Sequence, residues 1–402
     1  MKYAILVGDG MADFPVSELG GKTPLEASRI PNMRLVAARG RVGRVQTIPD
    51  GMPPGSDVAN LALLGYDPAV SYSGRGAIEA ASLGVVLDAD DTAFRCNLVM
   101  LRDGLMADYS SGHITTEESH GLIQELQPVL NTEKIRFYPG VSYRHLTVIK
   151  DFPEGLLATP PHDISGRPYK PHLPQGPGSD IILSLMDRAK PVLAASEINR
   201  RRIAAGKSPA TDIWPWGQGR AMKLRTFQER FGLRGSVISA VDLVNGLGVL
   251  AGLRVRRVAG ATGYLGTNYA GKVAAARAAL AEEDFVYLHI EAPDETGHEG
   301  IAAKKIQAIE EFDHHVVGEI LKLADEIGNL RILVAPDHAT PLSIMTHASD
   351  PVPYAVCGPG VEPGAVALYS EAAVANEPLE SAVSLFERFI KGSWPAVIRP
   401  AG

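Results

Sequence analysis

The stretch DFVYLHIEAPDETGH, residues 284–298, decides the expected fold of this 402-residue chain. Its first half has the apolar composition of a short buried strand, and acidic and imidazole side chains follow at once. The same order recurs at residues 3–9 and 331–338, where apolar runs lead into Asp9 and Asp337. Ligands of open α/β sheets bind beyond the carboxyl ends of the strands. The sequence therefore predicts a mostly parallel sheet with polar groups converging at one edge.

Helices alternate with these strands in both terminal parts of the chain, whereas the middle has a different texture. Residues 301–327 carry apolar side chains at helical spacing, so we expect one long amphipathic helix there. Residues 151–180 hold seven prolines and four glycines, too many for regular elements. We therefore expect a discontinuous α/β domain, residues 1–86 and 232–402, with a smaller α+β domain, residues 87–231, inserted into it.

The composition is that of an ordinary globular protein, with 45% hydrophobic and 21% charged residues. The net charge of −7 argues against nucleic-acid binding, which needs a basic face for the phosphates. The apolar run at the N-terminus is too short for a signal-peptide core, and no stretch predicts a membrane span. Cys96 and Cys357 are far apart, which argues against a disulfide framework. We expect a cytoplasmic protein without nucleic-acid or membrane partners, and self-association into a homo-oligomer stays open.

Three clusters of acidic and imidazole side chains occupy the last third of the chain, around Asp294, Asp337 and His347. One such pair alone is more often a satisfied polar pair than a metal site. Three of them, together with Asp9, favour divalent cations, because imidazole suits zinc or manganese and carboxylate suits manganese or magnesium. Two cations with three or four protein ligands each would use the whole set, which consists of Asp9, Ser56, Asp294, His298, Asp337, His338 and His347.

Ser56 begins an apolar helical stretch directly after the tight loop of residues 49–55. The simplest interpretation is a helix N-cap, a position that serine fills well. Taken by itself, Ser56 is expected to be such a cap, and the residues alone add it only to the possible metal ligands.

Several strings resemble a known family. The metal-binding motifs at residues 8–10, 54–57, 293–298, 337–338 and 347–353 are similar to those of the alkaline phosphatase superfamily. The chain as a whole looks like the archaeal-type, 2,3-bisphosphoglycerate-independent phosphoglycerate mutases. That closer match rests on residues 19–27, 64–68, 74–76, 214–219 and 260–264, and it covers essentially the whole chain.

The resemblance implies an alkaline-phosphatase-like sandwich and two divalent metal ions, manganese or magnesium, with zinc or cobalt as alternatives. It implies that Ser56 is the nucleophile and forms phosphoserine while 3-phosphoglycerate and 2-phosphoglycerate interconvert, without bisphosphoglycerate. The inserted domain is expected to close over the substrate. By motif matching, one metal is held by Asp9, Ser56, Asp337 and His338, and the other by Asp294, His298 and His347.

The inserted domain is expected to hold the substrate, because Arg binds carboxylate and phosphate in a bidentate manner. His and Asp side chains in its loops are candidates for proton transfer while the substrate turns. The candidate contacts are Arg95, Arg144, His145, His162, Asp163, Arg167, Arg200, Arg201 and Arg220.

Other features are expected to be structural. Asp313, His314 and His315 lie within the long helix, where a solvated face is the simpler reading, and His289 is expected in the core or on the sheet. Asn60 departs from the family pattern, which has His there, and matches a related bacterial subgroup proposed to be a homoserine kinase. A kinase-like phosphotransferase is therefore an alternative. A metal-dependent phosphomonoesterase and a non-catalytic metal-binding scaffold are others.

Overall fold

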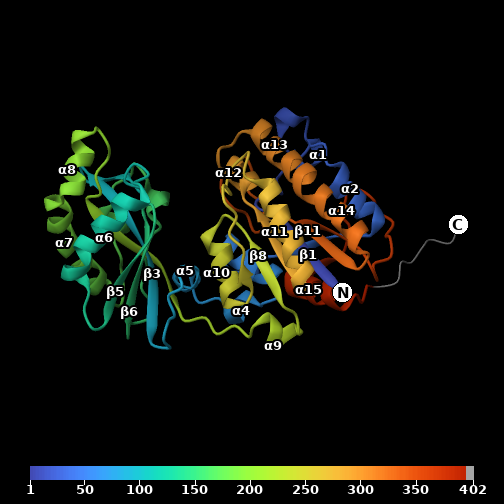
Figure 1. Ribbon diagram of the computed structural model, residues 1–402. Coiled ribbons are helices and arrows are strands. Elements are labelled where there is room, and N and C mark those ends of the chain that lie inside the picture. The colour runs from blue at the N-terminus through green and yellow to red at the C-terminus, as the bar shows by residue number, and fades with distance from the viewer. Residues whose placement is uncertain (395–402) are drawn as a thin grey trace. The chain divides into compact units, whose positions relative to one another are not determined.

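The computed structural model describes residues 1–394, and the chain forms two compact units (Figure 1). The first combines Met1–Tyr72 with the chain from Lys223 onward, and the second is Ser73–Met222. This division differs from the expected boundaries at residues 87 and 231, because α5 (Arg75–Ser82) belongs to the second unit. Gly74 and Gly76 pack tightly against the strands of that unit. A Cβ atom on Gly74 would lie 1.9 Å from the carbonyl oxygen of Gln218, and a Cβ atom on Gly76 would lie 2.1 Å from that of Ala93.

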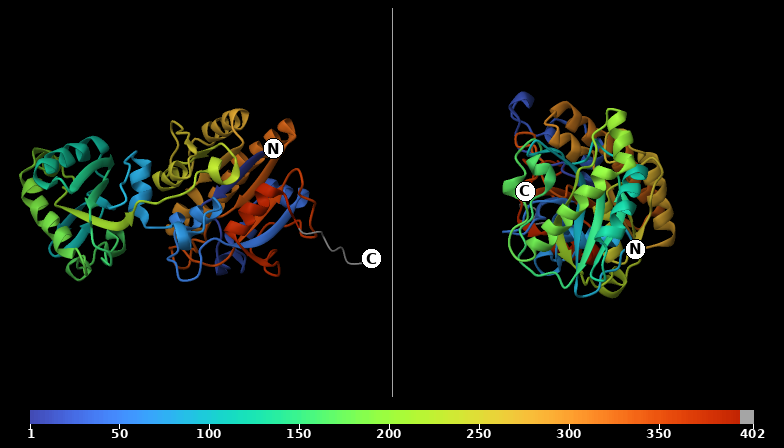
Figure 2. Two further views of the ribbon diagram at one scale, coloured as in Figure 1. Left: turned by 90° about the horizontal axis from the view of Figure 1, so that it is seen from below. Right: turned by 90° about the vertical axis from the view of Figure 1, so that its left-hand side faces the viewer.

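The first unit is built on an eight-stranded, mostly parallel sheet with the order β13-β2-β12-β11-β1-β10-β8-β9. β1 lies at its centre, parallel to both β10 and β11. Strand β12 is antiparallel to its two neighbours. In Figure 2, β2, in blue, lies beside the red C-terminal elements, as its pairing with β13 requires. The strands are β1 (Lys2–Gly8), β2 (Arg41–Gln46), β8 (Gly235–Ile238), β9 (Arg254–Val255), β10 (Phe285–Ile290), β11 (Leu330–Ala335), β12 (Val352–Cys357) and β13 (Leu379–Ser381).

Helices cover both faces of this sheet, as the α/β prediction requires (Figure 1). One layer contains α2 (Pro31–Arg39), α11 (Tyr269–Glu282), α13 (Ala302–Phe312) and α14 (Gly318–Ile327). The other contains α3 (Ser56–Leu63), α10 (Asp242–Leu250) and α15 (Ala382–Lys391). Shorter helices are α1 (Pro24–Ala27), α4 (Pro68–Ser71), α9 (Phe227–Phe231) and α12 (Ala292–His298). The buried strands and the first layer form one hydrophobic core.

The long helix expected at residues 301–327 is present but is interrupted by a π-helical turn, Asp313–Val317, between α13 and α14. The expectation of a solvated face is wrong for Asp313, which is buried. Its carboxylate accepts hydrogen bonds from the backbone N–H groups of Asn32 and Met33 at the start of α2. His314 and His315 are exposed, as expected. Asp313 lies four residues after Ile309 and three before Val316, so helical spacing places it on the same buried face as these two apolar side chains.

The second unit holds a separate five-stranded, antiparallel sheet in which β3 pairs with β4, β6 and β7. Phe94 and Cys96 face the core with α6 and α7, whereas Ala93 packs on the other face with α5. The remaining elements are β3 (Asp91–Arg102), β4 (Leu105–Asp108), α6 (Thr116–Leu130), β5 (Ile135–Val141), β6 (Arg144–Lys150), α7 (Ser179–Ala195), α8 (Glu197–Ala204) and β7 (Asp212–Arg220). Among the described residues of both units, no helix has the length and apolar character needed to cross a membrane.

Candidate active site and metal centre

The carboxyl ends of three neighbouring strands bring the candidate ligands of the first unit together. Asp9 follows β1, Asp337 and His338 follow β11, and Asp294 lies in α12, which begins two residues after β10. The register places Val7 of β1 opposite both β10 and β11, so the three strands end at the same level. The carboxylates of Asp9 and Asp337 are completely buried. This edge of the sheet therefore carries buried carboxylates that lie close together.

One cluster consists of Asp294, His298 and His347. The Nε2 atom of His298 lies 3.2 Å from Asp294 Oδ2 and 3.1 Å from His347 Nε2, which itself lies 3.5 Å from Asp294 Oδ1. His298 directs Nδ1 at the carbonyl of Met345, 3.0 Å away, so Nδ1–H donates there and Nε2 keeps its lone pair for the cluster. Two imidazole nitrogens and a carboxylate that face one another this closely need a cation or a proton between them.

The pKa shifts of His298 and Asp294 also favour a positive charge within this cluster. Burial alone would lower the pKa of His298, but the hydrogen bond and the charge of Asp294 raise it to about 9. Burial alone would raise the pKa of Asp294, but hydrogen bonds with His298 and His347 hold it well below its usual value. The cluster therefore favours a positive charge among its two imidazoles and its carboxylate, which a bound metal ion would also supply.

The second cluster surrounds the Nε2 atom of His338. Ser56 Oγ lies 3.0 Å from this atom, Asp9 Oδ1 lies 3.4 Å from it and Asp337 Oδ2 lies 3.6 Å from it. Both carboxylate oxygens of Asp9 are buried and make no hydrogen bond of good geometry, although His289 Nε2 lies 2.9 Å from Oδ2. A buried carboxylate that is incompletely hydrogen-bonded is costly, and a divalent cation coordinated by oxygen and imidazole removes that cost. The residues present therefore fit a metal ion here.

Asp9 itself shows the electrostatic cost of this arrangement. Burial and then the charges of Asp337, Glu291 and Asp294 raise the pKa of Asp9 well above its usual value. Four carboxylates thus share one buried region, and the groups that could hold metal fall into overlapping sets. Bound cations would be the largest local charges in such a site and would favour the ionised carboxylates.

Ser56 does not cap its helix. Gly55 is the N-cap residue of α3, and Ser56 is the first helical residue, with its hydroxyl directed at His338. Asp57 follows and accepts hydrogen bonds from the backbone N–H of Val58 and, at 2.5 Å, from the hydroxyl of Tyr72. The serine hydroxyl thus lies at a helix N-terminus, where backbone N–H groups can bind an anion, beside the second cluster of candidate ligands.

Asn60 braces the site from within α3. Its Nδ2 donates to Asp337 Oδ2 at 2.7 Å and to the carbonyl of Ser56 at 2.8 Å, and its Oδ1 accepts from the hydroxyl of Tyr287 at 2.5 Å. The side chain is completely buried. Both ends of the amide are therefore used by protein groups, so Asn60 gives no support to the kinase alternative that was raised by its presence.

Sequence reasoning missed two residues of this region. His289 is fully buried, as expected for a core residue, but its Nε2 lies 2.9 Å from Asp9 Oδ2, beside the second cluster. The hydroxyl of Thr340 donates a hydrogen bond to Asp294 Oδ1. The same hydroxyl oxygen lies 3.3 Å from His338 Nδ1 and accepts a hydrogen bond from Nδ1–H. His338 thereby keeps its Nε2 lone pair free. The position of Thr340 two residues after His338 was the signal that could have indicated it.

Three arginines and one glutamate form the basic cluster of the second unit. Arg95 and Arg75 lie 2.8 Å and 2.9 Å from the same oxygen of Glu79, and both guanidinium groups lie over Trp216, at 5.1 Å and 5.5 Å. The charge of Arg144 also lowers the pKa of Glu79, as do Arg95 and Arg75, against the effect of burial. Guanidinium groups bind carboxylate and phosphate in a bidentate manner, so these arginines around Glu79 are suited to an anion.

Arg144 lies over the ring of Tyr143, and its Nε is buried without a hydrogen-bond partner. It is paired across the strands with Asn97, on the face of the sheet that carries Arg95. His162 lies 5.3 Å from the ring of Trp216 and 3.5 Å from Asp163. The structure therefore brings four of the expected substrate residues to one neighbourhood: Arg95, Arg144, His162 and Asp163.

Two of the expected substrate residues lie elsewhere. His145 points to the opposite face of β6 from Arg144, is 1% exposed and accepts a hydrogen bond from Gly140 N. Burial, together with the charge of His120, lowers the pKa of His145 to about 3. Arg220 contacts the carbonyl of Phe152 and Glu154 instead of the basic cluster.

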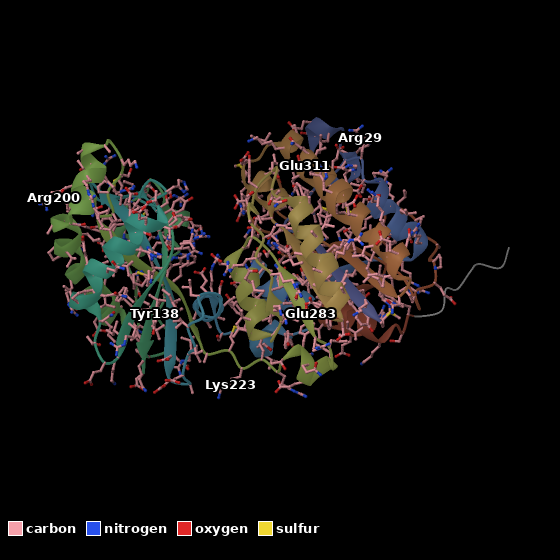
Figure 3. The ribbon with its side chains drawn as sticks, viewed as in Figure 1. Arg29, Tyr138, Arg200, Lys223, Glu283 and Glu311 are labelled. Carbon is pink, nitrogen blue, oxygen red and sulfur yellow. The ribbon has the colours of Figure 1, made fainter. Side chains whose placement is uncertain are left out.

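A further arginine of the inserted unit is also separate from the basic cluster. Arg200, labelled in Figure 3, lies on α8 and pairs with Glu197 at 2.7 Å. Its side chain is largely exposed. This position makes Arg200 a control for charge effects in the second unit.

Comparison with known proteins places this geometry in context. A family model described as 2,3-bisphosphoglycerate-independent phosphoglycerate mutase matches residues 37–199. The enzyme of that name from Methanosarcina acetivorans is 51% identical over 94% of this chain and 96% of its own length. A probable one from Geobacter sulfurreducens is 52% identical over 92% of this chain and 94% of its own length.

Two solved structures agree with these relatives. A protein from Pyrococcus horikoshii covers 98% of both chains at 27% identity, with a TM-score of 0.80. The cofactor-independent phosphoglycerate mutase from Thermoplasma acidophilum covers 97% of this chain and 99% of its own at 26% identity, with a TM-score of 0.65.

Proposed function

Because this chain belongs to the 2,3-bisphosphoglycerate-independent phosphoglycerate mutases, which are isomerases, we propose that Ser56 carries the phosphoryl group between the two hydroxyls of glycerate. The observation that supports this role is the position of Ser56 Oγ, at the start of α3 and 3.0 Å from His338 Nε2. Ser239 Oγ also lies near this region, but it contacts Nδ1 of His289, 3.2 Å away, rather than His338.

The reaction balances without an added cofactor. Ser56 Oγ attacks phosphorus as the bond from phosphorus to O3 of 3-phosphoglycerate breaks, and O3 takes up the proton that the serine loses. Glycerate then turns, and its O2 attacks the phosphoserine, whose Oγ recovers a proton. The product is 2-phosphoglycerate, and the serine is free again.

Two divalent cations are proposed to support these steps. Asp9, Ser56, Asp337 and His338 would hold one of them, and Asp294, His298 and His347 the other. When bound, such cations lower the pKa of a neighbouring hydroxyl and neutralise charge on the phosphoryl oxygens. The buried oxygens of Asp9, which make no hydrogen bond of good geometry, and the facing nitrogens of His298 and His347 support this assignment. Manganese or magnesium suits the mixed carboxylate and imidazole set, with zinc or cobalt as alternatives.

The basic cluster of the second unit is proposed to recognise the anionic substrate. Arg95 and Arg144 are suited to hold a carboxylate or phosphate. His162 and Asp163 are suited to exchange a proton with a hydroxyl of glycerate. The unpartnered Nε of Arg144 supports this role, because a buried guanidinium N–H normally has an acceptor. We leave His145 and Arg220 out of this set on the contacts described above.

The test is to assay Ser56→Ala protein with 3-phosphoglycerate, in the absence of bisphosphoglycerate and with manganese present. We expect formation of 2-phosphoglycerate to be lost. The matched control is Ser349→Ala, because Ser349 is exposed and only its carbonyl is used, by Gln46. Near-normal turnover of the Ser56 variant would contradict the proposal. Parent protein that ignored phosphoglycerate and phosphorylated homoserine from ATP would instead establish the kinase alternative.

A further inference from the structure

Lys305 is a charged residue inside the core of the first unit. It lies on α13, in the layer that covers the sheet, and its side chain is completely buried. An ammonium group costs several kcal/mol to remove from water unless it is paired and fully hydrogen-bonded. None of the metal or substrate roles described above uses Lys305.

The contacts of Lys305 satisfy its three N–H groups. Its Nζ donates to the carbonyl of Ala12 at 3.1 Å, to Asp13 Oδ2 at 2.8 Å and to the carbonyl of Thr340 at 2.8 Å. Asp13 is equally buried, so the two charges neutralise each other away from water. These three hydrogen bonds form a junction that joins α13 to Ala12, Asp13 and Thr340.

The partners of Lys305 belong to the two loops that carry metal-ligand candidates. Ala12 and Asp13 follow Asp9 in the loop after β1, and Thr340 follows His338 in the loop after β11. The loops also bond directly, since Thr340 N donates to the carbonyl of Ala12 at 3.2 Å. Lys305 therefore ties α13 to both loops at the point where they meet.

Thr340 extends this junction to both clusters of candidate ligands. Its hydroxyl bonds Asp294 of the first cluster and lies 3.3 Å from Nδ1 of His338 in the second. Its carbonyl is the group that Lys305 holds. A shift of the Thr340 backbone would therefore displace a ligand in each cluster.

We propose that Lys305 is a positioning residue that sets the divalent-cation affinity of both clusters through Thr340 and through the loop after Asp9. This inference rests on the proposed metal centre. Loss of a residue that orients metal ligands typically weakens metal binding by about 10-fold to 100-fold. The loss of Lys305 is expected to act at both sites together, because its contacts reach a ligand of each.

The test compares Mn²⁺ binding by full-length variants, measured by titration calorimetry on metal-free protein. Lys305→Met alone would leave Asp13 buried without its partner and could unfold the unit. The informative variant is therefore Lys305→Met with Asp13→Asn, which removes both charges but keeps an acceptor for the backbone N–H groups of Phe14 and Leu342. Circular dichroism of the metal-free protein checks that it is folded. The control is Lys304→Met, because the neighbouring Lys304 pairs with Glu299 at the surface.

We expect the double variant to fold, to bind Mn²⁺ about tenfold or more weakly at both sites, and to need correspondingly more Mn²⁺ for half-maximal turnover at an unchanged KM for phosphoglycerate. The Lys304 variant should match the parent. A folded double variant with the parent's Mn²⁺ affinity would overturn the positioning role alone. Parent protein that bound no divalent cation would overturn the proposed metal centre, and the positioning role with it. If the double variant does not fold, Asp13→Asn alone, which weakens the junction, must still reduce Mn²⁺ affinity for the role to stand.

Discussion

Replacing Asn60 with alanine should destabilise the first unit and loosen the metal cluster. Asn60 makes one hydrogen bond to a carboxylate, of Asp337, and two to neutral groups, Ser56 O and Tyr287 Oη. A bond to a charged partner contributes about 1.5–3 kcal/mol and a neutral bond about 0.5–1.5 kcal/mol. The sum spans roughly 2.5–6 kcal/mol, and we expect a loss of about 3 kcal/mol, because a cation at the proposed site would offset part of the cost at Asp337.

The assay must isolate the first unit, since a two-unit chain need not unfold in a single step. Hydrogen exchange of the backbone amides in β1 and β10 reports on that unit. Tyr287→Phe is the comparison, because it removes one of the three bonds and should cost about 1 kcal/mol. The Asn60 variant should also bind Mn²⁺ about tenfold more weakly. A loss below about 0.5 kcal/mol together with parental Mn²⁺ affinity would refute the bracing role.

The remaining predictions concern charge, metal and substrate. Burial raises the pKa of Asp212 from 3.8 to about 7, so the folded state keeps a proton that the unfolded state loses and stability should fall between about pH 4 and 7. Asp212→Asn should therefore stabilise the second unit by about 2–4 kcal/mol at pH 8 and little at pH 4. Unfolding of this unit can be measured by the fluorescence of Trp214 and Trp216. Equal stabilisation at both pH values would contradict the prediction. Chelation should abolish mutase activity and Mn²⁺ or Mg²⁺ should restore it, whereas a chelator-resistant enzyme would exclude the metal centre. Arg144→Ala should lower kcat/KM about 10-fold to 100-fold while Arg200→Ala leaves it unchanged; equal values for the two variants would remove Arg144 from substrate binding.

The arrangement of the candidate metal ligands could be predicted because it follows from strand ends. Asp9, Asp294 and Asp337 each lie shortly after a buried apolar strand, and parallel strands end at one edge of a sheet. The order of those strands was beyond the sequence. Only the structure shows that β1 lies between β10 and β11, which makes the three strand ends immediate neighbours.

Other features depended on details that the sequence pattern does not carry. Arg144 and His145 are adjacent in a promising motif, but a strand directs successive side chains to opposite faces, so only one of them reaches the basic cluster. Asp313 is buried because its carboxylate accepts hydrogen bonds at the start of α2, and a contact with so distant a segment does not follow from the sequence of the helix alone. The boundary near residue 73 depends on the close approach of Gly74 and Gly76 to strands distant in the chain.

The most direct test of the account is to quench the working enzyme in acid and look for the phosphoryl group. After rapid mixing with 3-phosphoglycerate and manganese, digestion and mass spectrometry should find one phosphorylated peptide, with the modification on Ser56. Transfer that leaves every peptide unmodified, or modifies a different side chain, would contradict the claim that this hydroxyl carries the group between the two positions of glycerate.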